Sequence, residues 1–246
     1  MKYKFTFKLD NPLELPINYN HIMQAALISW LDNEKYQKFL HDYGYKYENR
    51  TFKMYSYSKI FGTFRIDREN KKIIFFDIIY FYISSCDKEF LEYLGKNIIT
   101  ENKLNLIGNL LTLEKFECIL EEVEEECMIK TLSPITVYST LVSQDGKKKT
   151  YYYSPFESEF SELIKNNLIK KYEAFNCKKL DYYDFKITPI KETLKESVIF
   201  YKGFIVKGWN GVFEIKGNKE LIEVALNSGM GSKNSQGMGC IILKNI

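Results

Sequence analysis

Near its end the chain reads Gly229-Met230-Gly231-Ser232-Lys233-Asn234-Ser235-Gln236-Gly237-Met238-Gly239, with two Gly-Met-Gly triplets on either side of a polar segment. A helix-like stretch over residues 218–227 precedes it, and a short apolar run over 240–243 follows. Because glycine lacks a Cβ, its backbone can adopt positive φ and bring N–H groups close to a ligand. We interpret this glycine-rich loop as a helix-to-strand connection that holds phosphate groups with its N–H groups and Lys233. A turn shaped only by local geometry is the alternative, and the pairing of two triplets favours phosphate contact.

The elements expected in the first half alternate between strand and helix. Residues 2–9 alternate strictly between apolar and polar side chains, which is typical of a half-buried strand. We expect helices over 18–31, 33–41 and 88–99, and strands over 52–58, 64–67, 72–79 and the apolar region 104–119. The order is therefore β-α-β-β-α-β.

The second half repeats this order. Strand-like segments lie at 127–130 and 136–138, and 151–153 can close a hairpin across Asp145-Gly146. Further elements are helices over 156–175 and 219–226 and strands over 185–189, 198–206, 212–215 and 239–243. We predict an α+β fold of two tandem ferredoxin-like (RRM-like) domains, residues 1–122 and 123–246, with the boundary near 121–126. Such folds host many functions, including RNA binding.

Charge is unevenly distributed along the chain. Residues 114–126 hold seven glutamates and one lysine, a local charge of −6, whereas the whole chain of 246 residues carries +3. The remainder therefore carries +9, which suits a polyanionic partner on a restricted face. A solvated acidic surface beside ordinary lysines is the alternative, and the charge pattern alone is a weak signal.

The number and spacing of the cysteines, histidines and apolar residues exclude several classes of protein. The 5 cysteines are scattered without a Cys-x-x-Cys pair and there are only 2 histidines, so we expect no zinc, no other metal or cofactor, and no disulfide framework. No uninterrupted apolar run reaches the ~18 residues of a membrane span, and the N-terminus does not resemble a signal peptide. We expect a cytoplasmic protein without a membrane partner.

Four stretches, taken in order, resemble the sixth CRISPR-associated (Cas) protein family of the repeat-associated RNA-binding superfamily. They are Leu15-Pro16-Ile17-Asn18-Tyr19-Asn20-His21 followed by Gln24; Phe39-Leu40-His41-Asp42 followed by Phe52-Lys53-Met54-Tyr55-Ser56-Tyr57-Ser58; Lys130-Thr131-Leu132-Ser133-Pro134-Ile135; and the glycine-rich loop. The resemblance covers nearly the whole chain. It implies tandem ferredoxin-like domains and an endoribonuclease that cuts precursor CRISPR RNA within its repeats.

The resemblance also implies roles for particular residues and partners. His41 would be catalytic and Lys53 would stabilise the transition state. The implied partners are CRISPR repeat RNA, as precursor and as mature guide, and other Cas proteins of an effector complex. The implied RNA-binding residues are Gly229, Gly231, Lys233, Asn234, Ser235, Gly237 and Gly239.

One position departs from the family. Some members place a catalytic tyrosine on the first helix, four residues after the glutamine that matches Gln24, and Ile28 occupies that position here. Tyrosines near His41 can replace the missing hydroxyl group. We assign Tyr43 as the third catalytic group, with Tyr45 and Tyr47 as alternatives.

These residues suit RNA cleavage without metal. The substrate's 2′-hydroxyl attacks the adjacent phosphorus and the 5′-oxygen leaves, giving a 2′,3′-cyclic phosphate and a 5′-hydroxyl. Histidine transfers protons near neutral pH, and lysine stabilises charge on the phosphate oxygens. Spacing alone leaves His41 equally open to a structural role at a helix C-terminus, and the resemblance favours catalysis. His21 is expected to be structural or adjacent to RNA.

Two other functions remain open from sequence. A non-catalytic RNA-binding subunit of a CRISPR effector complex would share the glycine-rich loop without needing His41 for turnover. A nucleotide-binding ferredoxin-like regulator would show no salt-dependent affinity for RNA. Metal-dependent hydrolysis is disfavoured because no His, Asp or Glu cluster has ligand spacing.

Overall fold

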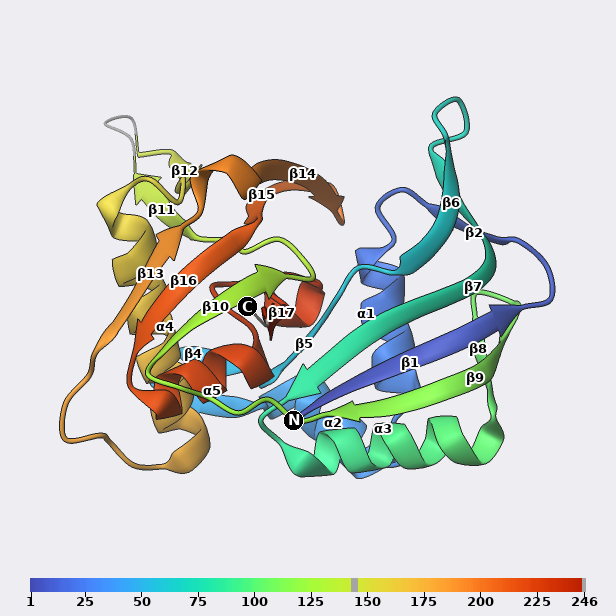
Figure 1. Ribbon diagram of the computed structural model, residues 1–246, viewed down its shortest axis with the longest axis horizontal. Coiled ribbons are helices and arrows are strands. Elements are labelled where there is room, and N and C mark those ends of the chain that lie inside the picture. The colour runs from blue at the N-terminus through green and yellow to red at the C-terminus, as the bar shows by residue number, and fades with distance from the viewer. Residues whose placement is uncertain (143–145, 245–246) are drawn as a thin grey trace.

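The computed structural model describes residues 1–142 and 146–244, and two main antiparallel sheets organise these residues side by side (Figure 1). In the N-terminal half the strands pair in the order β2-β7-β1-β9-β8, and β5 and β6 also pair with β7. These strands are β1 (Lys2–Leu9), β2 (Leu13–Pro16), β5 (Tyr55–Tyr57), β6 (Phe61–Asp67), β7 (Lys72–Ser85), β8 (Lys103–Leu106) and β9 (Asn109–Ile119). The helices are α1 (Asn20–Ser29), α2 (Glu34–Lys38) and α3 (Lys88–Glu101), with a π-helical turn η1 (Phe39–Tyr43). A small hairpin joins β3 (Tyr45–Tyr47) to β4 (Arg50–Phe52).

The sheet of the C-terminal half has the order β13-β16-β10-β17. Its strands are β10 (Glu126–Thr131), β13 (Phe185–Pro189), β16 (Val212–Gly217) and β17 (Ile241–Leu243), and its helices are α4 (Ser158–Asn176) and α5 (Lys219–Ser228). Two hairpins are added, β11 (Tyr138–Val142) with β12 (Lys148–Tyr152) and β14 (Lys195–Tyr201) with β15 (Phe204–Asn210). Single 3₁₀ turns are η2 (Lys191–Thr193) and η3 (Asn234–Gln236).

Both halves have the strand order of a ferredoxin-like fold. In the C-terminal half the first and third strands, β10 and β16, lie between β17 and β13, with α4 and α5 as the crossover helices. In the N-terminal half β1 and β7 are flanked by β9 on one side and by β2, β5 and β6 on the other. The predicted α+β fold of two tandem ferredoxin-like units is confirmed. The division at residues 122 and 123 stays a proposal, supported by the passage of the chain from β9 to β10 at this point.

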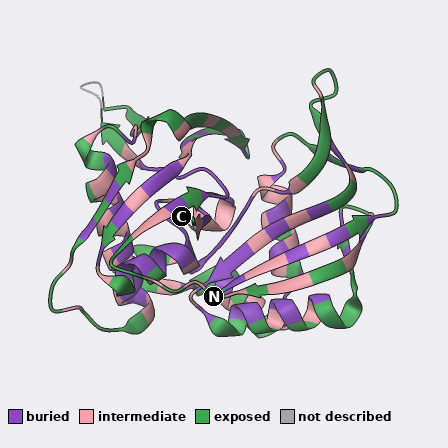
Figure 2. Ribbon diagram, in the orientation of Figure 1, coloured by how far each residue is buried: buried purple, intermediate pink, exposed green. Residues whose placement is uncertain are grey.

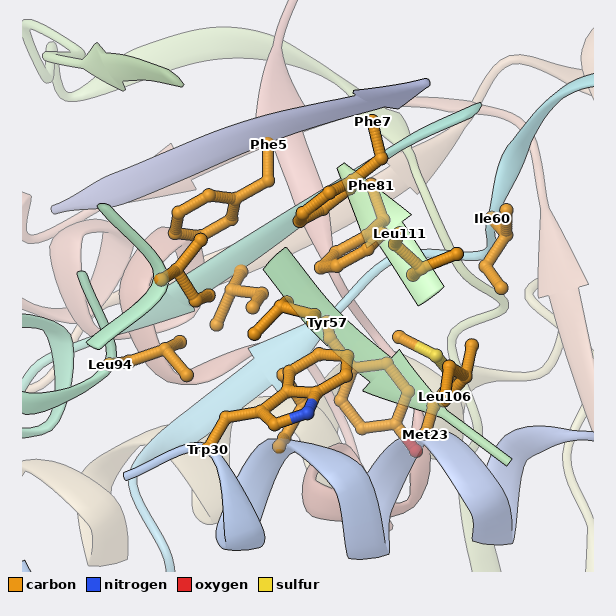
Figure 3. Packing of buried hydrophobic residues seen from close by; sticks show 14 of the residues in the cluster. Phe5, Phe7, Met23, Trp30, Tyr57, Ile60, Phe81, Leu94, Leu106 and Leu111 are labelled. Atoms are coloured by element: carbon orange, nitrogen blue, oxygen red, sulfur yellow. The ribbon is translucent and has the colours of Figure 1, made fainter. Parts of the chain in front are cut away.

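The alternation in β1 builds the first hydrophobic core. Phe5 and Phe7 point inward and are fully buried, and the ring of Phe7 stacks on Phe81 of β7 with a centroid distance of 5.4 Å. Trp30, just after α1, stacks on the other side of Phe81 at 6.3 Å (Figure 3). Met23 of α1 closes this cluster below the sheet. Burial of each such aromatic side chain contributes about 1.5–3 kcal/mol to stability. The shared cluster therefore fixes the position of α1 against β1 and β7.

The second core forms between α4 and β16. Phe160, Ile164 and Leu168 recur every four residues along α4 and are buried on one face against Phe213 of β16. Figure 2 shows buried residues concentrated along the central strands of both sheets and on α5, and exposed residues along β6 and β14. Within the part of the chain that the structure describes, no helix is long and apolar enough to cross a membrane.

Several predicted elements are wrong in detail. The strand predicted over 52–58 is divided between β4, which pairs with β3, and β5, which pairs with β7. Regions 104–119 and 198–206 are hairpins, because Ile107-Gly108 and Lys202-Gly203 both adopt positive φ and reverse the chain. The helix predicted over 33–41 is regular only to Lys38 and continues as η1. Asp145, expected in the turn of the second-half hairpin, lies outside the described residues.

Candidate functional site

His41 lies in a segment that is fixed at both ends. Asn33 caps α2 by accepting a hydrogen bond from the Tyr36 N–H at 2.9 Å, and Gly44, with φ of 64°, ends η1. The hydroxyl groups of Tyr36 and Tyr45, on either side of η1, both donate to the buried Asp87. The backbone is therefore held while the His41 side chain stays 84% exposed.

His41 and Lys53 lie close together. The His41 Nδ1 lies 2.7 Å from Asp42 Oδ1, and this hydrogen bond lowers the pKa of Asp42. Lys53 Nζ donates to the His41 carbonyl oxygen at 3.1 Å. Burial lowers the pKa of Lys53, and the Asp42 charge opposes that shift.

A pocket of about 470 Å³ opens beside these groups, and we call it the His41 pocket. Its lining includes His41 and Lys53 together with His21, Gln24, Tyr55 and Lys202. His21 thus belongs to the same site, with its Nδ1 3.1 Å from the Asn18 carbonyl oxygen. Lys202 comes from the β14–β15 hairpin, which reaches toward α1 (Figure 1). The Tyr201 hydroxyl donates to Gln24 and the Phe200 N–H to Asn18, so the hairpin is tied to α1.

The predicted third catalytic group is not in this pocket. Tyr43 is 53% exposed, its ring lies 5.9 Å from Lys46 Nζ, and it is not among the described residues that line the pocket. The Tyr45 hydroxyl is occupied by Asp87, and burial raises the pKa of Tyr45. The assignment of Tyr43 to catalysis therefore stays a prediction without support from the geometry.

The four glycines of the glycine-rich loop are buried and have positive φ, between 71° and 85°. A Cβ on Gly231 would lie 2.5 Å from the Thr136 carbonyl oxygen, and one on Gly237 would lie 2.5 Å from Asn20 Nδ2. A Cβ on Gly239 would overlap the Met230 carbonyl oxygen. Internal packing alone therefore requires glycine here, because the loop lies against α1, β5 and the segment before β11.

A larger cleft of about 750 Å³, the loop cleft, lies along the exposed side of the glycine-rich loop. The residues of the loop that line it include Gly231, Lys233, Asn234 and Ser235. Gly229, Gly237 and Gly239 are buried and are not among the described residues that line it. The backbone N–H groups of residues 233–235 donate no hydrogen bond to the described part of the chain. Lys233 Nζ lies 5.2 Å from the centre of the Tyr138 ring, and burial lowers the pKa of Lys233.

Lys53 connects the two cavities. Lys53 and Tyr55 line both the His41 pocket and the loop cleft, because the chain between β4 and β5 runs between them. The candidate catalytic pair and the glycine-rich loop, distant in sequence, therefore form one continuous site. Among the described residues, no group of His, Cys, Asp or Glu side chains is arranged to hold a metal ion.

Sequence reasoning missed two site lysines. Lys202 sits in the turn between β14 and β15, in a region that the sequence predicts as one strand, and the signal is Gly203, because glycine inside a strand pattern indicates an irregularity. Lys171 is 2% exposed and lines the loop cleft from α4. The signal was present here too, because Lys171 follows Ile164 and Leu168 on the apolar face of α4, where a charged residue is rare.

Two family models match adjacent parts of the chain. A family model described as "CRISPR associated protein Cas6, C-terminal" matches residues 113–243, and one described as "CRISPR-associated protein Cas6, N-terminal" matches residues 14–117.

Two curated relatives are similar along most of their length. CRISPR-associated endoribonuclease Cas6 1 of Methanocaldococcus jannaschii is 29% identical over 98% of this chain and 92% of the relative. CRISPR-associated endoribonuclease Cas6 of Pyrococcus furiosus is 27% identical over 94% of this chain and 84% of the relative.

A solved structure described as "CRISPR associated protein Cas6" is also similar, with a TM-score of 0.79 and 27% identity over 100% of this chain and 99% of the other. Since the match to the C-terminal family model alone spans more than half of the residues, the chain belongs to the CRISPR associated protein Cas6 family.

Proposed function

We propose that the chain is an endoribonuclease that cuts precursor CRISPR RNA within its repeats, without a metal ion. The observation that carries the proposal is the position of Lys53, whose ammonium group touches the His41 backbone and lines the loop cleft. A phosphate next to Lys53 would lie beside an exposed imidazole. The relatives in M. jannaschii and P. furiosus, which are named endoribonucleases, support the same activity.

The proposed reaction is an internal transesterification of RNA. The 2′-oxygen forms a bond to the adjacent phosphorus, and the bond from phosphorus to the 5′-oxygen breaks. His41, 84% exposed, transfers protons at the reacting oxygens, while Asp42 accepts its Nδ1–H and orients the ring. Lys53 stabilises the negative charge of the transition state. The products are a 2′,3′-cyclic phosphate and a 5′-hydroxyl.

The loop cleft is proposed to hold the RNA strand next to the cut. Its cationic side chains are Arg50, Lys53, Lys171 and Lys233, and no acidic residue of the described chain lines it. The phosphates of a strand suit these charges, and the Tyr138 ring offers a surface for a base. Repeat RNA, before and after cutting, and other Cas proteins of an effector complex are the proposed partners.

A second function, RNA binding without turnover, is favoured by one observation. The hydroxyl groups close to the His41 pocket are engaged or buried. Ser29 Oγ donates to the Ala26 carbonyl oxygen at 2.8 Å, Tyr201 donates to Gln24, and the Tyr55 side chain is buried. A protein of this kind would bind repeat RNA as tightly as the proposed nuclease but would not cut it.

Incubation of the purified protein with a CRISPR repeat RNA in excess chelator tests the proposal. We expect cutting at one position, a cyclic phosphate on the upstream product, and no cutting when the nucleotide before the cut carries a 2′-deoxy sugar. Cutting that stops on chelation and returns with Mg²⁺ would contradict metal independence. Tight binding of an intact RNA would favour the second function.

A further inference from the structure

Lys171 of α4 ties the glycine-rich loop together from below. Its Nζ donates to the Gly229 carbonyl oxygen at 2.6 Å and to Asn234 Oδ1 at 2.7 Å. The Asn234 amide nitrogen in turn donates to the carbonyl oxygens of Met230 and Met238, each at 3.1 Å. One lysine and one asparagine thus connect both Gly-Met-Gly triplets of the loop.

The Lys171 charge has no paired counter-charge among the described residues. Lys171 is 2% exposed, and no carboxylate pairs with it among the described residues. The ionisable group that acts on it is the Cys86 thiol, whose pKa burial raises to about 12, so this thiol is neutral at physiological pH. A buried cation without a paired anion is costly, which suggests that an anion arrives from outside.

The loop cleft above Lys171 contains further groups that await a partner. Asn167 of α4 and Gln236 of the loop line the cleft, and their buried side-chain oxygens, Asn167 Oδ1 and Gln236 Oε1, accept no hydrogen bond from the described residues. Buried side-chain oxygens normally have a donor. Either oxygen would be satisfied if its side chain turned toward the cleft and met a donor on a base or a ribose, while the cations of the cleft suit phosphate.

We propose that Lys171 is a positioning residue for RNA binding: its charge holds the glycine-rich loop in its binding shape, and RNA phosphate in the loop cleft compensates that charge. The proposal rests on the function proposed above and concerns binding rather than cleavage. Lys171 itself is too deeply buried to be a surface contact. It acts through Gly229 and Asn234 and through its field in the cleft.

RNA binding should then be coupled to proton uptake. Burial lowers the pKa of Lys171 to about 7, and phosphate nearby favours the charged form and raises that pKa. Affinity is therefore independent of this group below pH 7 and falls as pH rises above it. The charged and titratable side chains that line the cleft together with Lys171 are Arg50, Lys53, Tyr55, Tyr138 and Lys233, and the Cys86 thiol also acts on Lys171. Burial also lowers the pKa values of Lys53 and Lys233, so their titration must be separated by mutation.

The test measures affinity for a repeat RNA blocked by a 2′-deoxy sugar, from pH 6 to pH 9 at fixed salt. We expect Lys171→Met to bind about tenfold more weakly at pH 6.5, the loss of roughly one charge-assisted interaction, and to lose the fall in affinity at high pH. Lys170→Met is the matched control, because it removes one charge from the same helix outside the cleft. It should keep the affinity and the pH profile of the parent.

Melting temperatures distinguish positioning from folding. Lys171→Met relieves a buried uncompensated charge but leaves the acceptors of Gly229 and Asn234 without this donor, so the two effects oppose each other and the melting temperature should change little. A purely structural role predicts that stability and affinity fall together. If Lys171→Met does not fold, Lys171→Arg decides, because its permanent charge should keep the affinity high up to pH 9.

Two results would overturn the proposal. One is parental affinity in Lys171→Met, and the other is a fall at high pH that survives in both Lys171 variants. The binding test uses blocked RNA and does not depend on cleavage. If binding behaves as expected but unblocked RNA is not cut, the result counts against the proposed function alone. Failure of the parent protein to bind any repeat RNA would remove both.

Discussion

Among single residues, His41 combines a fixed backbone with an exposed ring. The Asp87 carboxylate holds Tyr36 and Tyr45 on either side of η1, and Lys53 binds the His41 carbonyl oxygen. Only the ring therefore remains free to move toward a substrate. His41 lies in the last turn of η1, but its ring is 84% exposed and its Nδ1 pairs with the Asp42 carboxylate, so this arrangement favours a catalytic role over stabilisation of the helix end.

The His41→Ala variant should bind repeat RNA with parental affinity and lose most cleavage. A proton-transfer group contributes about 10²–10⁴-fold to the rate, and the exposed ring makes no packing contact that binding needs. Single-turnover cleavage and equilibrium binding on the same RNA measure the two effects.

His21→Ala is the matched control for this prediction, because His21 lines the same pocket and its ring contacts the Asn18 carbonyl oxygen. Its loss of rate should be smaller. An equal or larger loss with His21→Ala would show that the assignment of proton transfer to His41 is wrong.

At the scale of elements, strand periodicity predicted where strands run but not where they reverse. Regions 104–119 and 198–206 have continuous β-favouring composition, and the turns inside them use Ile107 and Lys202 in left-handed backbone. Asparagine or aspartate before glycine is the usual signal for such turns. Isoleucine and lysine disfavour this conformation, so local propensity pointed away from the structure that tertiary pairing imposes.

Ile107→Asn should therefore stabilise the protein. Ile107 has φ of 51° and is 56% exposed, so the substitution relieves backbone strain and removes little buried surface. Asparagine tolerates this conformation well, and about 0.5–1 kcal/mol of stability is the expected gain. Chemical denaturation measures it.

Leu110→Asn provides the comparison, since Leu110 is also exposed in this hairpin but has ordinary strand geometry. It should be neutral or destabilising. Equal gains in the two variants would show that removal of exposed apolar surface, rather than relief of φ, is responsible. Cleavage should not change in either variant, because neither residue lines the proposed site.

At the scale of the whole molecule, the site exists only because the two halves pack together. The sequence predicted the glycine-rich loop between a helix and a strand, and α5 and β17 confirm that position. It could not predict that the glycines face inward, since the atoms that exclude a Cβ belong to Thr136, Met230 and Asn20. Nor could it predict that Lys53 of one half would share a cleft with Lys233 of the other.

The acidic segment 114–126 also acquires a role at this scale. A solvated acidic strip was one of the two interpretations of the sequence, and in the structure Glu117, Glu121, Glu124 and Glu126 all pair with lysines. The Lys2–Glu121 pair is buried, with side chains 0% and 9% exposed. Glu121 Oε1 also accepts a hydrogen bond from the Leu243 N–H of β17 at 2.6 Å. One carboxylate therefore joins β1 of the first half to β17 of the second.

Lys2→Met should destabilise the protein strongly, because it leaves the Glu121 carboxylate buried without its cation. Loss of one partner of such a pair costs about 3–5 kcal/mol. The double variant Lys2→Met with Glu121→Gln should recover most of this, since the neutral amide still accepts from Leu243. Lys8→Met, an exposed lysine on the same strand, is the control and should change little.

The same variants test whether the pair couples the halves. Trp30 and Trp209 are the only tryptophans, one in each half, so replacing either by phenylalanine leaves a fluorescent reporter of the other half. With the Lys2–Glu121 pair intact, both reporters should give one unfolding midpoint, which is the signature of a cooperative transition. In Lys2→Met the two midpoints should separate. The unpaired Glu121 carboxylate is then more stable in water than between β1 and β17, so the contact between the halves is weakened. Coincident midpoints at a lower denaturant concentration would mean that the pair stabilises the fold without coupling its halves, and the packing of the glycine-rich loop on β5 would then carry the coupling.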